Sequence, residues 1–412
     1  MRTKLVFAFL LALILAAPAR AEAKRPAADG PQVSAESAIL VDTGDGHVLY
    51  RRAAGSRRSI ASATKLMTAL LAVERLPLAR RVPAAPYRAA PAESQIRLSP
   101  GERMSVGDLL RGLMLESAND AAVTLARGVS GSIEGFVQLM NRRAKELRLT
   151  QTHYANPVGL DEAGNYSSAR DLAALARVVL KNEFLAETAD MARARLLSGA
   201  RPRIVDNRND LVARVPWIDG LKTGHTIRAD YVLVGAATRK GARLVSVVLG
   251  TPSEGARDAD TLALFDYGFG QYRRIVPLHR SRAAAEVKVA FFGDRKVAVE
   301  PARTLAVSVR RGERVRTRID APGELEGPLS AGARVGRASV YVDGRRVRSI
   351  ALVTAEAVPE AGFVRKVAHW LLWPWALAAL ILLGLTVAAR RHRRLAAADA
   401  ARRRRRQAAR LD

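Results

Sequence analysis

The sequence contains three short polar stretches in order: Ser62-Ala-Thr-Lys65, Ser117-Ala-Asn119, and Lys222-Thr-Gly224 followed by His225. Ser62 and Lys65 are three residues apart, so on a helix they share a face and the lysine amine reaches the serine hydroxyl. The residues around them are apolar, which predicts a buried helix, and burial together with the second cation Lys222 would lower the pKa of Lys65. Because a neutral amine can act as a base, this pattern predicts a serine nucleophile activated by a lysine.

The second and third stretches supply polar groups that suit a substrate cleft. Ser117-Ala-Asn119 fits a loop that leads into a helix over residues 120–127, where short polar side chains are also favoured simply as caps. Lys222-Thr-Gly224 fits a strand, where the glycine lets a substrate backbone approach and the lysine is either a source of positive potential or an exposed strand lysine. S-x-x-K, S-D-N and K-T-G are together the signature of class A β-lactamases and penicillin-binding proteins, and this chain has Ala118 in place of the aspartate.

Longer stretches around these motifs resemble the D-alanyl-D-alanine carboxypeptidases of the low-molecular-mass penicillin-binding proteins. The matching stretches lie between residues 33 and 272 and read IASATKLMT (60–68), LMLESANDAAVTLA (113–126), NPVGL (156–160), NRNDL (207–211) and DGLKTGHT (219–226). Asp230 stands where the family is expected to have glycine, which bears on strand packing more than on chemistry. The resemblance implies an α+β, β-lactamase/transpeptidase-like fold and a serine-type carboxypeptidase activity.

The resemblance also implies a role for the residues of the three motifs. Ser62 would attack the penultimate D-Ala carbonyl of a peptidoglycan stem pentapeptide and release the terminal D-Ala, and the acyl-enzyme would then be hydrolysed. β-Lactam antibiotics would mimic this substrate and acylate Ser62. The other implied roles are proton relay to the leaving amine by Ser117, binding of the substrate amide by Asn119, binding of the terminal carboxylate by Thr223 and Thr226, and an oxyanion hole formed by the backbone N–H groups of Ser62 and His225. For the His225 side chain, packing is an equally good interpretation.

Three other functions share parts of this machinery. A class A β-lactamase also needs a glutamate in an E-x-x-L-N string between the second and third motifs, and Glu162-Ala-Gly-Asn165 is a poor substitute for it. A D,D-endopeptidase, which cuts peptidoglycan cross-links, uses the same residues, so the sequence barely separates it from a carboxypeptidase. A non-catalytic module that binds β-lactams or the cell wall is disfavoured because the full set of polar residues is present.

The start of the chain indicates an exported protein. Arg2 and Lys4 precede an apolar run from Leu5 to Ala17, and Ala19-Arg20-Ala21 offers a cleavage site, so residues 1–21 are predicted to be a signal peptide. The formal net charge is +28, but export argues against nucleic acid as a partner. The basic surface is either simply solvated or attracted to anionic lipids or wall polymers, and the sequence leaves both open.

Cysteine and histidine usage limits the possible chemistry. The 412 residues include no cysteine, so the fold must rely on its core, and thiol catalysis and zinc–thiolate sites are excluded. The six histidines are scattered without a helical i, i+4 pair. We therefore expect neither a metal nor a cofactor.

Hydrophobic periodicity predicts one α+β catalytic domain over residues 33–272, after a linker at residues 24–33. The predicted strands lie at residues 37–42, 47–51, 219–223, 231–238 and 244–249. Helical periodicity dominates from Ser62 to about residue 195, with segments at residues 106–114, 118–127, 133–147 and 168–180. Strands on both sides of a helical block predict an antiparallel sheet closed by the two ends of the domain and covered by helices.

Three further segments follow this domain. Short alternating runs between residues 286 and 358 predict a small all-β domain, which we interpret as a spacer. Residues 367–389 carry no formal charge and predict a transmembrane helix across about 30 Å of hydrocarbon, with an amphipathic helix on the membrane surface as the alternative. Residues 390–412 are rich in arginine, which favours a cytoplasmic tail. The sequence thus predicts a cell-envelope protein whose exported catalytic domain is anchored to the cytoplasmic membrane.

Overall fold

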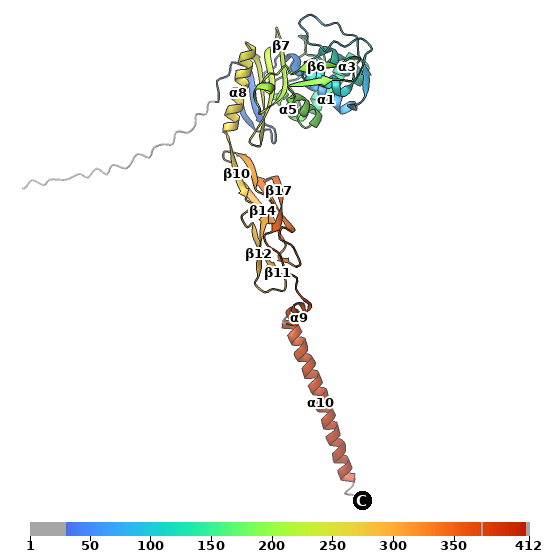
Figure 1. The fold of residues 1–412 in the computed structure, drawn as a ribbon, viewed down its shortest axis with the longest axis vertical. Helices are drawn as coiled ribbons and strands as arrows, with labels where there is room; N and C mark the ends of the chain where they lie inside the picture. The colour runs from blue at the N-terminus through green and yellow to red at the C-terminus, as the bar shows by residue number, and fades with distance from the viewer. Residues whose placement is uncertain (1–29, 372–373, 409–412) are drawn as a thin grey trace, which may run out of the picture. The chain divides into compact units, whose positions relative to one another are not determined.

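The computed structural model describes residues 30–371 and 374–408, and these form two compact units (Figure 1). One unit runs to Thr238 and resumes from Arg243 to Phe269. The other comprises Arg239–Ala242 and the chain from Gly270 on. The predicted signal peptide, residues 1–21, lies outside the described residues.

The first unit is built on a five-stranded sheet with the order β2-β1-β9-β8-β7. The strands span Ser37–Asp42 (β1), Val48–Arg52 (β2), Ile218–Thr226 (β7), Asp230–Arg239 (β8) and Ala242–Thr251 (β9). β1 pairs antiparallel with both β2 and β9, so the first and last strands of the unit lie side by side in the sheet. This confirms the predicted sheet, in which strands from before and after the helical block come together.

Helices cover both faces of this sheet (Figure 1). α8 (Glu254–Gly270) lies along one face, where its Phe265 comes close to Gly235 of β8. The other helices are α1 (Lys65–Arg75), α2 (Val106–Met114), α3 (Asn119–Ser130), α4 (Ile133–Glu146), α5 (Ala169–Val179), α6 (Glu183–Asp190) and α7 (Leu211–Arg214). Four of them are capped by a side chain that accepts a hydrogen bond from the backbone N–H three residues later, which fixes where they begin: Ser105, Ser132, Ser168 and Asn182.

Short two-stranded ladders connect these helices. β3 (Arg81–Pro83) pairs with β4 (Arg103–Ser105), and β5 (Arg193–Leu196) pairs with β6 (Arg203–Asp206). The segment between β3 and β4 packs against the start of α3, as described below.

α1 is buried along most of its length, from Lys65 to Ala72. The sequence predicts a helix that starts at Ser62, whereas Ser62 lies in a 3₁₀ turn over Ala61–Thr64 and α1 begins one turn later. In a 3₁₀ turn the side chains at i and i+3 eclipse one another. Ser62 and Lys65 therefore still share a face.

Asp230 occupies a position that favours glycine. Its φ is 50°, in the left-handed region that residues with a Cβ adopt at an energetic cost, although aspartate tolerates it better than most. It pairs with Thr226 at the end of the β7–β8 ladder, where the chain turns between the two strands. The positive φ explains why glycine is expected at this position. The replacement of that glycine by Asp230 affects only this exposed turn.

The second unit contains the predicted all-β domain. Its six-stranded sheet has the order β14-β16-β17-β12-β11-β15, and β10 pairs with β13 separately. The strands span Tyr272–Leu278 (β10), Ala285–Val289 (β11), Lys296–Pro301 (β12), Leu305–Arg310 (β13), Val315–Asp320 (β14), Glu324–Leu325 (β15), Arg334–Val342 (β16) and Arg345–Thr354 (β17). Alternate side chains of β12 and β13 are buried in a separate apolar core, which explains the alternating pattern in the sequence.

The C-terminal part of the second unit differs from its prediction. The described residues form α9 (Phe363–Leu371) and α10 (Pro374–Ala408), and residues 372 and 373 lie outside them. Among the helices of the described residues, none is both long and apolar enough to cross a membrane. The single spanning helix predicted over residues 367–389 is therefore not found there, because residues 367–371 end α9 and the apolar part of α10 continues directly into Arg390 and Arg391.

Candidate active site

Ser62 and Lys65 form the centre of the candidate site. The Nζ atom of Lys65 donates a hydrogen bond of 2.9 Å to Oγ of Ser62 and another of 2.6 Å to the backbone oxygen of Val158. The Lys65 side chain is fully buried. The hydrogen bond to the backbone oxygen of Val158 therefore helps to hold the Lys65 amine beside the Ser62 hydroxyl.

The surroundings of Lys65 favour a neutral amine. Burial lowers the pKa of Lys65 well below its ordinary value of 10.5, and the positive charge of Lys222 lowers it further, whereas the negative charge of Glu93 acts in the opposite direction. A lowered pKa increases the unprotonated fraction of the amine, and only an unprotonated amine can accept the proton of an adjacent hydroxyl. The geometry and the charges together suit activation of Ser62 by Lys65.

The stretch at residues 156–160 supplies the acceptors for α1. The backbone oxygens of Pro157 and Val158 accept hydrogen bonds from the side chains of Thr68 (2.7 Å) and Lys65 (2.6 Å). Gly159 follows with a φ of +89°, and a Cβ there would lie 2.0 Å from the backbone oxygen of Ala61. Only glycine fits this contact. The stretch thus presses against the turn that carries Ser62.

The third motif lies on β7, at the edge of the sheet. Lys222 is only 1% exposed, and its Nζ donates a 2.9 Å hydrogen bond to the backbone oxygen of Thr223. Burial, with further contributions from the positive charges of Arg208 and Arg257, lowers the pKa of Lys222 to about 7. This excludes the alternative of an exposed strand lysine.

Gly224 brings β7 against the nucleophile. A Cβ at Gly224 would lie 2.7 Å from the backbone nitrogen of Ser62, closer than van der Waals contact allows. The missing side chain therefore lets the strand approach the Ser62 amide, with the His225 backbone next in the chain.

The next two residues of β7 make contacts of their own. The His225 ring lies 4.2 Å, centre to centre, from the ring of Tyr231, so its side chain packs on the neighbouring strand. Thr226 donates a 2.8 Å hydrogen bond through Oγ1 to Oδ1 of Asp161, which is exposed. The Thr226 hydroxyl is therefore engaged by a carboxylate of the chain itself.

The second motif joins a loop to α3. Ser117 is 7% exposed and has a φ of 63°, an unfavourable backbone conformation of the kind that recurs at functional sites. Asn119 is the first residue of α3 and does not cap it; Ala118 occupies the N-cap position, without a side-chain cap. The Nδ2 atom of Asn119 instead donates a 2.7 Å hydrogen bond to Oε2 of Glu93.

Sequence reasoning missed three contributors to this site. Glu93 contacts the second motif from a loop that carries no motif of its own, and the Val158 acceptor is a backbone atom, which leaves no side-chain signal. Arg257 is 3% exposed on α8, bonded to Asp258, and its charge acts on Lys222. A buried arginine in an amphipathic helix is the only signal that could have pointed to it.

Comparison with known proteins identifies the family. Residues 22–253 match the family model described as D-alanyl-D-alanine carboxypeptidase, and residues 273–360 match the model for the C-terminal domain of penicillin-binding protein 5. The chain belongs to the D-alanyl-D-alanine carboxypeptidase family. The members of this family are serine hydrolases related to the low-molecular-mass penicillin-binding proteins, so the predicted resemblance and enzyme class are confirmed.

Curated members of the carboxypeptidase family are similar over most of their length. The D-alanyl-D-alanine carboxypeptidase DacF of Bacillus subtilis (strain 168) is 32% identical over 339 residues, which are 80% of this chain and 87% of DacF. The D-alanyl-D-alanine carboxypeptidase DacA of Escherichia coli (strain K12) is 30% identical over 360 residues, which are 83% of this chain and 88% of DacA.

Solved structures of the carboxypeptidase family share the fold. Penicillin-binding protein 5 from Haemophilus influenzae aligns with a TM-score of 0.58 and 28% identity, covering 81% of this chain and 100% of that one. The Streptomyces K15 DD-transpeptidase aligns with a TM-score of 0.56 and 32% identity, covering 59% of this chain and 99% of that one. The catalytic α+β fold is thus shared with both structures, and the alignment with penicillin-binding protein 5 extends over more of this chain than the alignment with the K15 enzyme.

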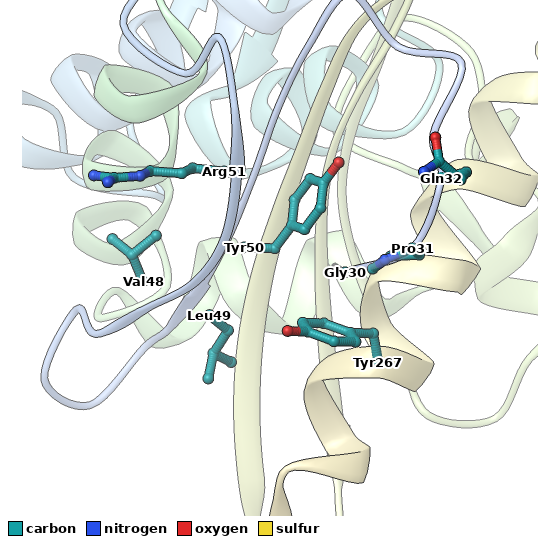
Figure 2. Close-up of a pocket in the computed structure, with 8 residues that line it drawn as sticks. All are labelled: Gly30, Pro31, Gln32, Val48, Leu49, Tyr50, Arg51 and Tyr267. Carbon is teal, nitrogen blue, oxygen red and sulfur yellow. The ribbon is translucent and has the colours of Figure 1, made fainter. Parts of the chain in front are cut away.

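The described residues also contain a pocket that lies apart from these motifs. A pocket of about 570 Å³ is lined by Tyr50 and Tyr267 together with residues 30–32, 48, 49 and 51 (Figure 2), and it includes no residue of the three motifs. Within residues 30–371 and 374–408, no group of three or more acidic or histidine side chains could hold a metal ion.

The close approach at Gly224 generates a prediction. Gly224→Ala places a methyl group against the Ser62 amide, and we expect the rate of acylation by a fluorescent penicillin to fall roughly a hundredfold, the scale expected for a displacement of about 1 Å at a reacting group. Gly255→Ala is the matched control, because a Cβ at Gly255 meets no atom within 4 Å. Acylation by the Gly224→Ala variant at the wild-type rate would contradict this packing.

Proposed function

We propose that this chain is a serine-type D-Ala-D-Ala carboxypeptidase that removes the terminal D-Ala from peptidoglycan stem pentapeptides through a Ser62 acyl-enzyme. The observation that carries the proposal is the 2.9 Å contact between a buried lysine amine and the Ser62 hydroxyl, in a chain of the carboxypeptidase family. DacF and DacA are both named carboxypeptidases, which favours this activity over the endopeptidase and the non-catalytic alternatives.

Acylation would proceed by transfer of the Ser62 proton to neutral Lys65 as Oγ attacks the penultimate D-Ala carbonyl carbon. The negative charge on the carbonyl oxygen would be stabilised by the backbone N–H groups of Ser62 and His225, which the Gly224 contact supports. The bond between the carbonyl carbon and the nitrogen of the terminal D-Ala would then break. Ser117 would relay a proton to that leaving nitrogen, and an ester on Ser62 would remain.

Deacylation would restore the enzyme. A water molecule would attack the ester carbonyl, its proton going to the amine of Lys65, and the Ser62 oxygen would leave and take a proton back. β-Lactams carry a carbonyl that would acylate Ser62 by the same first step. Such acylation would make this chain bind penicillin covalently, as the similarity to penicillin-binding proteins suggests.

Substrate binding would use the rest of the motifs. Asn119 would hold the peptide amide, and Thr223 would bind the terminal carboxylate in the positive potential of Lys222 and Arg257. A role of Thr226 in binding that carboxylate would require its hydroxyl to leave Asp161. The β-domain carries no residue of the three motifs, and we interpret it as a spacer.

Replacement of the two central residues separates nucleophile from base. Ser62→Ala removes the atom that forms the ester, so we expect covalent penicillin labelling and D-Ala release both to disappear. Lys65→Arg introduces a guanidinium that stays positively charged and cannot accept a proton near neutral pH, so we expect acylation to slow by roughly 10²–10⁴-fold. Mass spectrometry of labelled protein and detection of released D-Ala measure these outcomes. Labelling of Ser62→Ala, or normal turnover by Lys65→Arg, would refute the assigned roles.

The cellular location is a further part of the proposal. We propose that the catalytic domain is exported and that the C-terminal region attaches it to the cytoplasmic membrane, a location supported by the apolar residues 374–389 and the arginines that follow them. We expect the full chain to sediment with membranes and to be released by detergent, whereas a chain ending at Glu360 stays in the soluble exported fraction. Identical fractionation of the two chains would contradict this attachment.

A further inference from the structure

The loop between β3 and β4, residues 84–102, is bound to the start of α3 by its backbone. The backbone nitrogen of Asn119 donates a 2.8 Å hydrogen bond to the oxygen of Ser94. Asp120, which is 3% exposed, accepts hydrogen bonds from the backbone nitrogens of Ile96 (3.1 Å) and Leu98 (2.9 Å). The loop is thus fixed against the second motif.

The far side of the same loop is fixed as well. Arg203 of β6 donates a 2.8 Å hydrogen bond to the backbone oxygen of Ile96 and forms a buried ion pair of 2.8 Å with Glu102. A loop held from both sides can place a side chain accurately at a reacting centre.

Glu93 is the side chain that this loop presents to the motif. Its Oε2 atom accepts a 2.7 Å hydrogen bond from Nδ2 of Asn119 and a further one from the hydroxyl of Tyr87, and its Oε1 atom accepts a 3.0 Å hydrogen bond from the backbone nitrogen of Ala90. Although partial burial raises it, the hydrogen bonds from Tyr87 and Ala90 hold the pKa of Glu93 below its ordinary value. Glu93 is therefore a carboxylate, which only accepts hydrogen bonds.

A carboxylate beside Asn119 determines which way that amide points. An asparagine amide can present either a donor or an acceptor in each direction, but its oxygen cannot face a carboxylate without repulsion. Nδ2 is therefore held toward Glu93, and Oδ1 is the atom left to accept a hydrogen bond from a substrate N–H. Asn119 itself is 5% exposed, so little water competes for this contact.

We propose that Glu93 is a positioning residue of this enzyme, which fixes the Asn119 amide so that its oxygen faces the peptide N–H of the substrate. The inference rests on the proposed function, because it assigns a role in substrate binding to Asn119. It goes beyond the three motifs, since Glu93 lies outside all of them.

The charge of Glu93 also acts on the base. The groups that face Lys65 are Ser62, the Val158 oxygen, Lys222 and Glu93, and Glu93 alone among them carries a negative charge. Those that face Glu93 are Tyr87, Asn119 and Lys65, with Asp120 close to Tyr87. Loss of the Glu93 charge should therefore lower the pKa of Lys65.

Two replacements of similar size test the proposal. Glu93→Gln keeps an oxygen that can accept from Asn119, whereas Glu93→Leu does not. We expect Glu93→Leu to lower the rate of acylation roughly tenfold or more, the loss expected for a hydrogen bond to a charged group, and Glu93→Gln to stay within about threefold of the wild type. In Glu93→Gln, the acid limb of the pH–rate profile should also move to lower pH, because loss of the negative charge lowers the pKa of Lys65. This shift reports the charge of Glu93, whereas the difference between Glu93→Leu and Glu93→Gln reports its hydrogen bond to Asn119.

A double-mutant cycle tests whether Glu93 acts through Asn119. We expect the effect of Glu93→Leu to disappear in an Asn119→Ala background, because the amide that it positions is then absent. Glu187→Leu is the control for removing an exposed carboxylate, since Glu187 lies on the surface of α6 without an ion pair among the described residues. Thermal denaturation shows whether each variant is folded.

The experiments distinguish failure of the positioning role of Glu93 from failure of the proposed Ser62 acyl-enzyme. Labelling that depends on Ser62 in the full chain establishes the acyl-enzyme first, and the cycle is then measured with the same fluorescent penicillin. Wild-type acylation by Glu93→Leu, equal losses in Glu93→Gln and Glu93→Leu, or additive effects of Glu93→Leu and Asn119→Ala would each overturn the positioning role and leave the function of Ser62 intact.

Discussion

The site depends on one constraint: the Lys65 amine must be buried and must still touch the Ser62 oxygen. A charged ammonium in an apolar interior is strongly unfavourable, and a lysine resolves this by giving up its proton more easily. A lowered pKa leaves more of the Lys65 amine unprotonated, and the contact of 2.9 Å between Nζ and Oγ places that amine where a proton must leave. The burial of α1 from Lys65 to Ala72 is thus part of the chemistry as well as of the core.

Close backbone approaches hold this pair in place. Gly159 and Gly224 let the segment at residues 156–160 and strand β7 reach backbone atoms of the turn that carries Ser62, and each contact excludes a side chain. Lys222, buried on β7, adds the positive charge that lowers the pKa of Lys65 further. The sheet and the helical layer therefore meet at Ser62: α1 supplies Lys65, and strand β7 supplies Gly224 and Lys222.

The sequence predicted the parts of this arrangement that leave a side-chain pattern. The strand over residues 37–42 and the helix over residues 106–114 lie where their periodicity placed them, because burial dictates which positions are apolar. The 3₁₀ turn at Ser62 shifted the start of α1 by one turn, since no capping side chain marks it. The Val158 acceptor and the contact from Glu93 were not predictable, because a backbone oxygen has no sequence signature and the Glu93 loop is fixed by hydrogen bonds to distant residues. Among the helices of the described residues none matches the predicted membrane span, because hydropathy registers an apolar run but not where helices begin and end.

The central claim is that Lys65 is neutral when it takes the proton of Ser62. The most direct test is the pH dependence of the second-order rate constant for acylation by a fluorescent penicillin. It is measured for the wild type and for Lys222→Gln. The variant is needed because the pKa of Lys222 is itself lowered to about 7, so that its titration must be separated from that of Lys65. For the wild type we expect an acid limb with a midpoint well below 10.5, the ordinary pKa of lysine. In Lys222→Gln this acid limb should persist and lie at higher pH than in the wild type, because a neighbouring positive charge is gone. An acid limb near 10.5 in the wild type, or one that vanishes with Lys222, would contradict it.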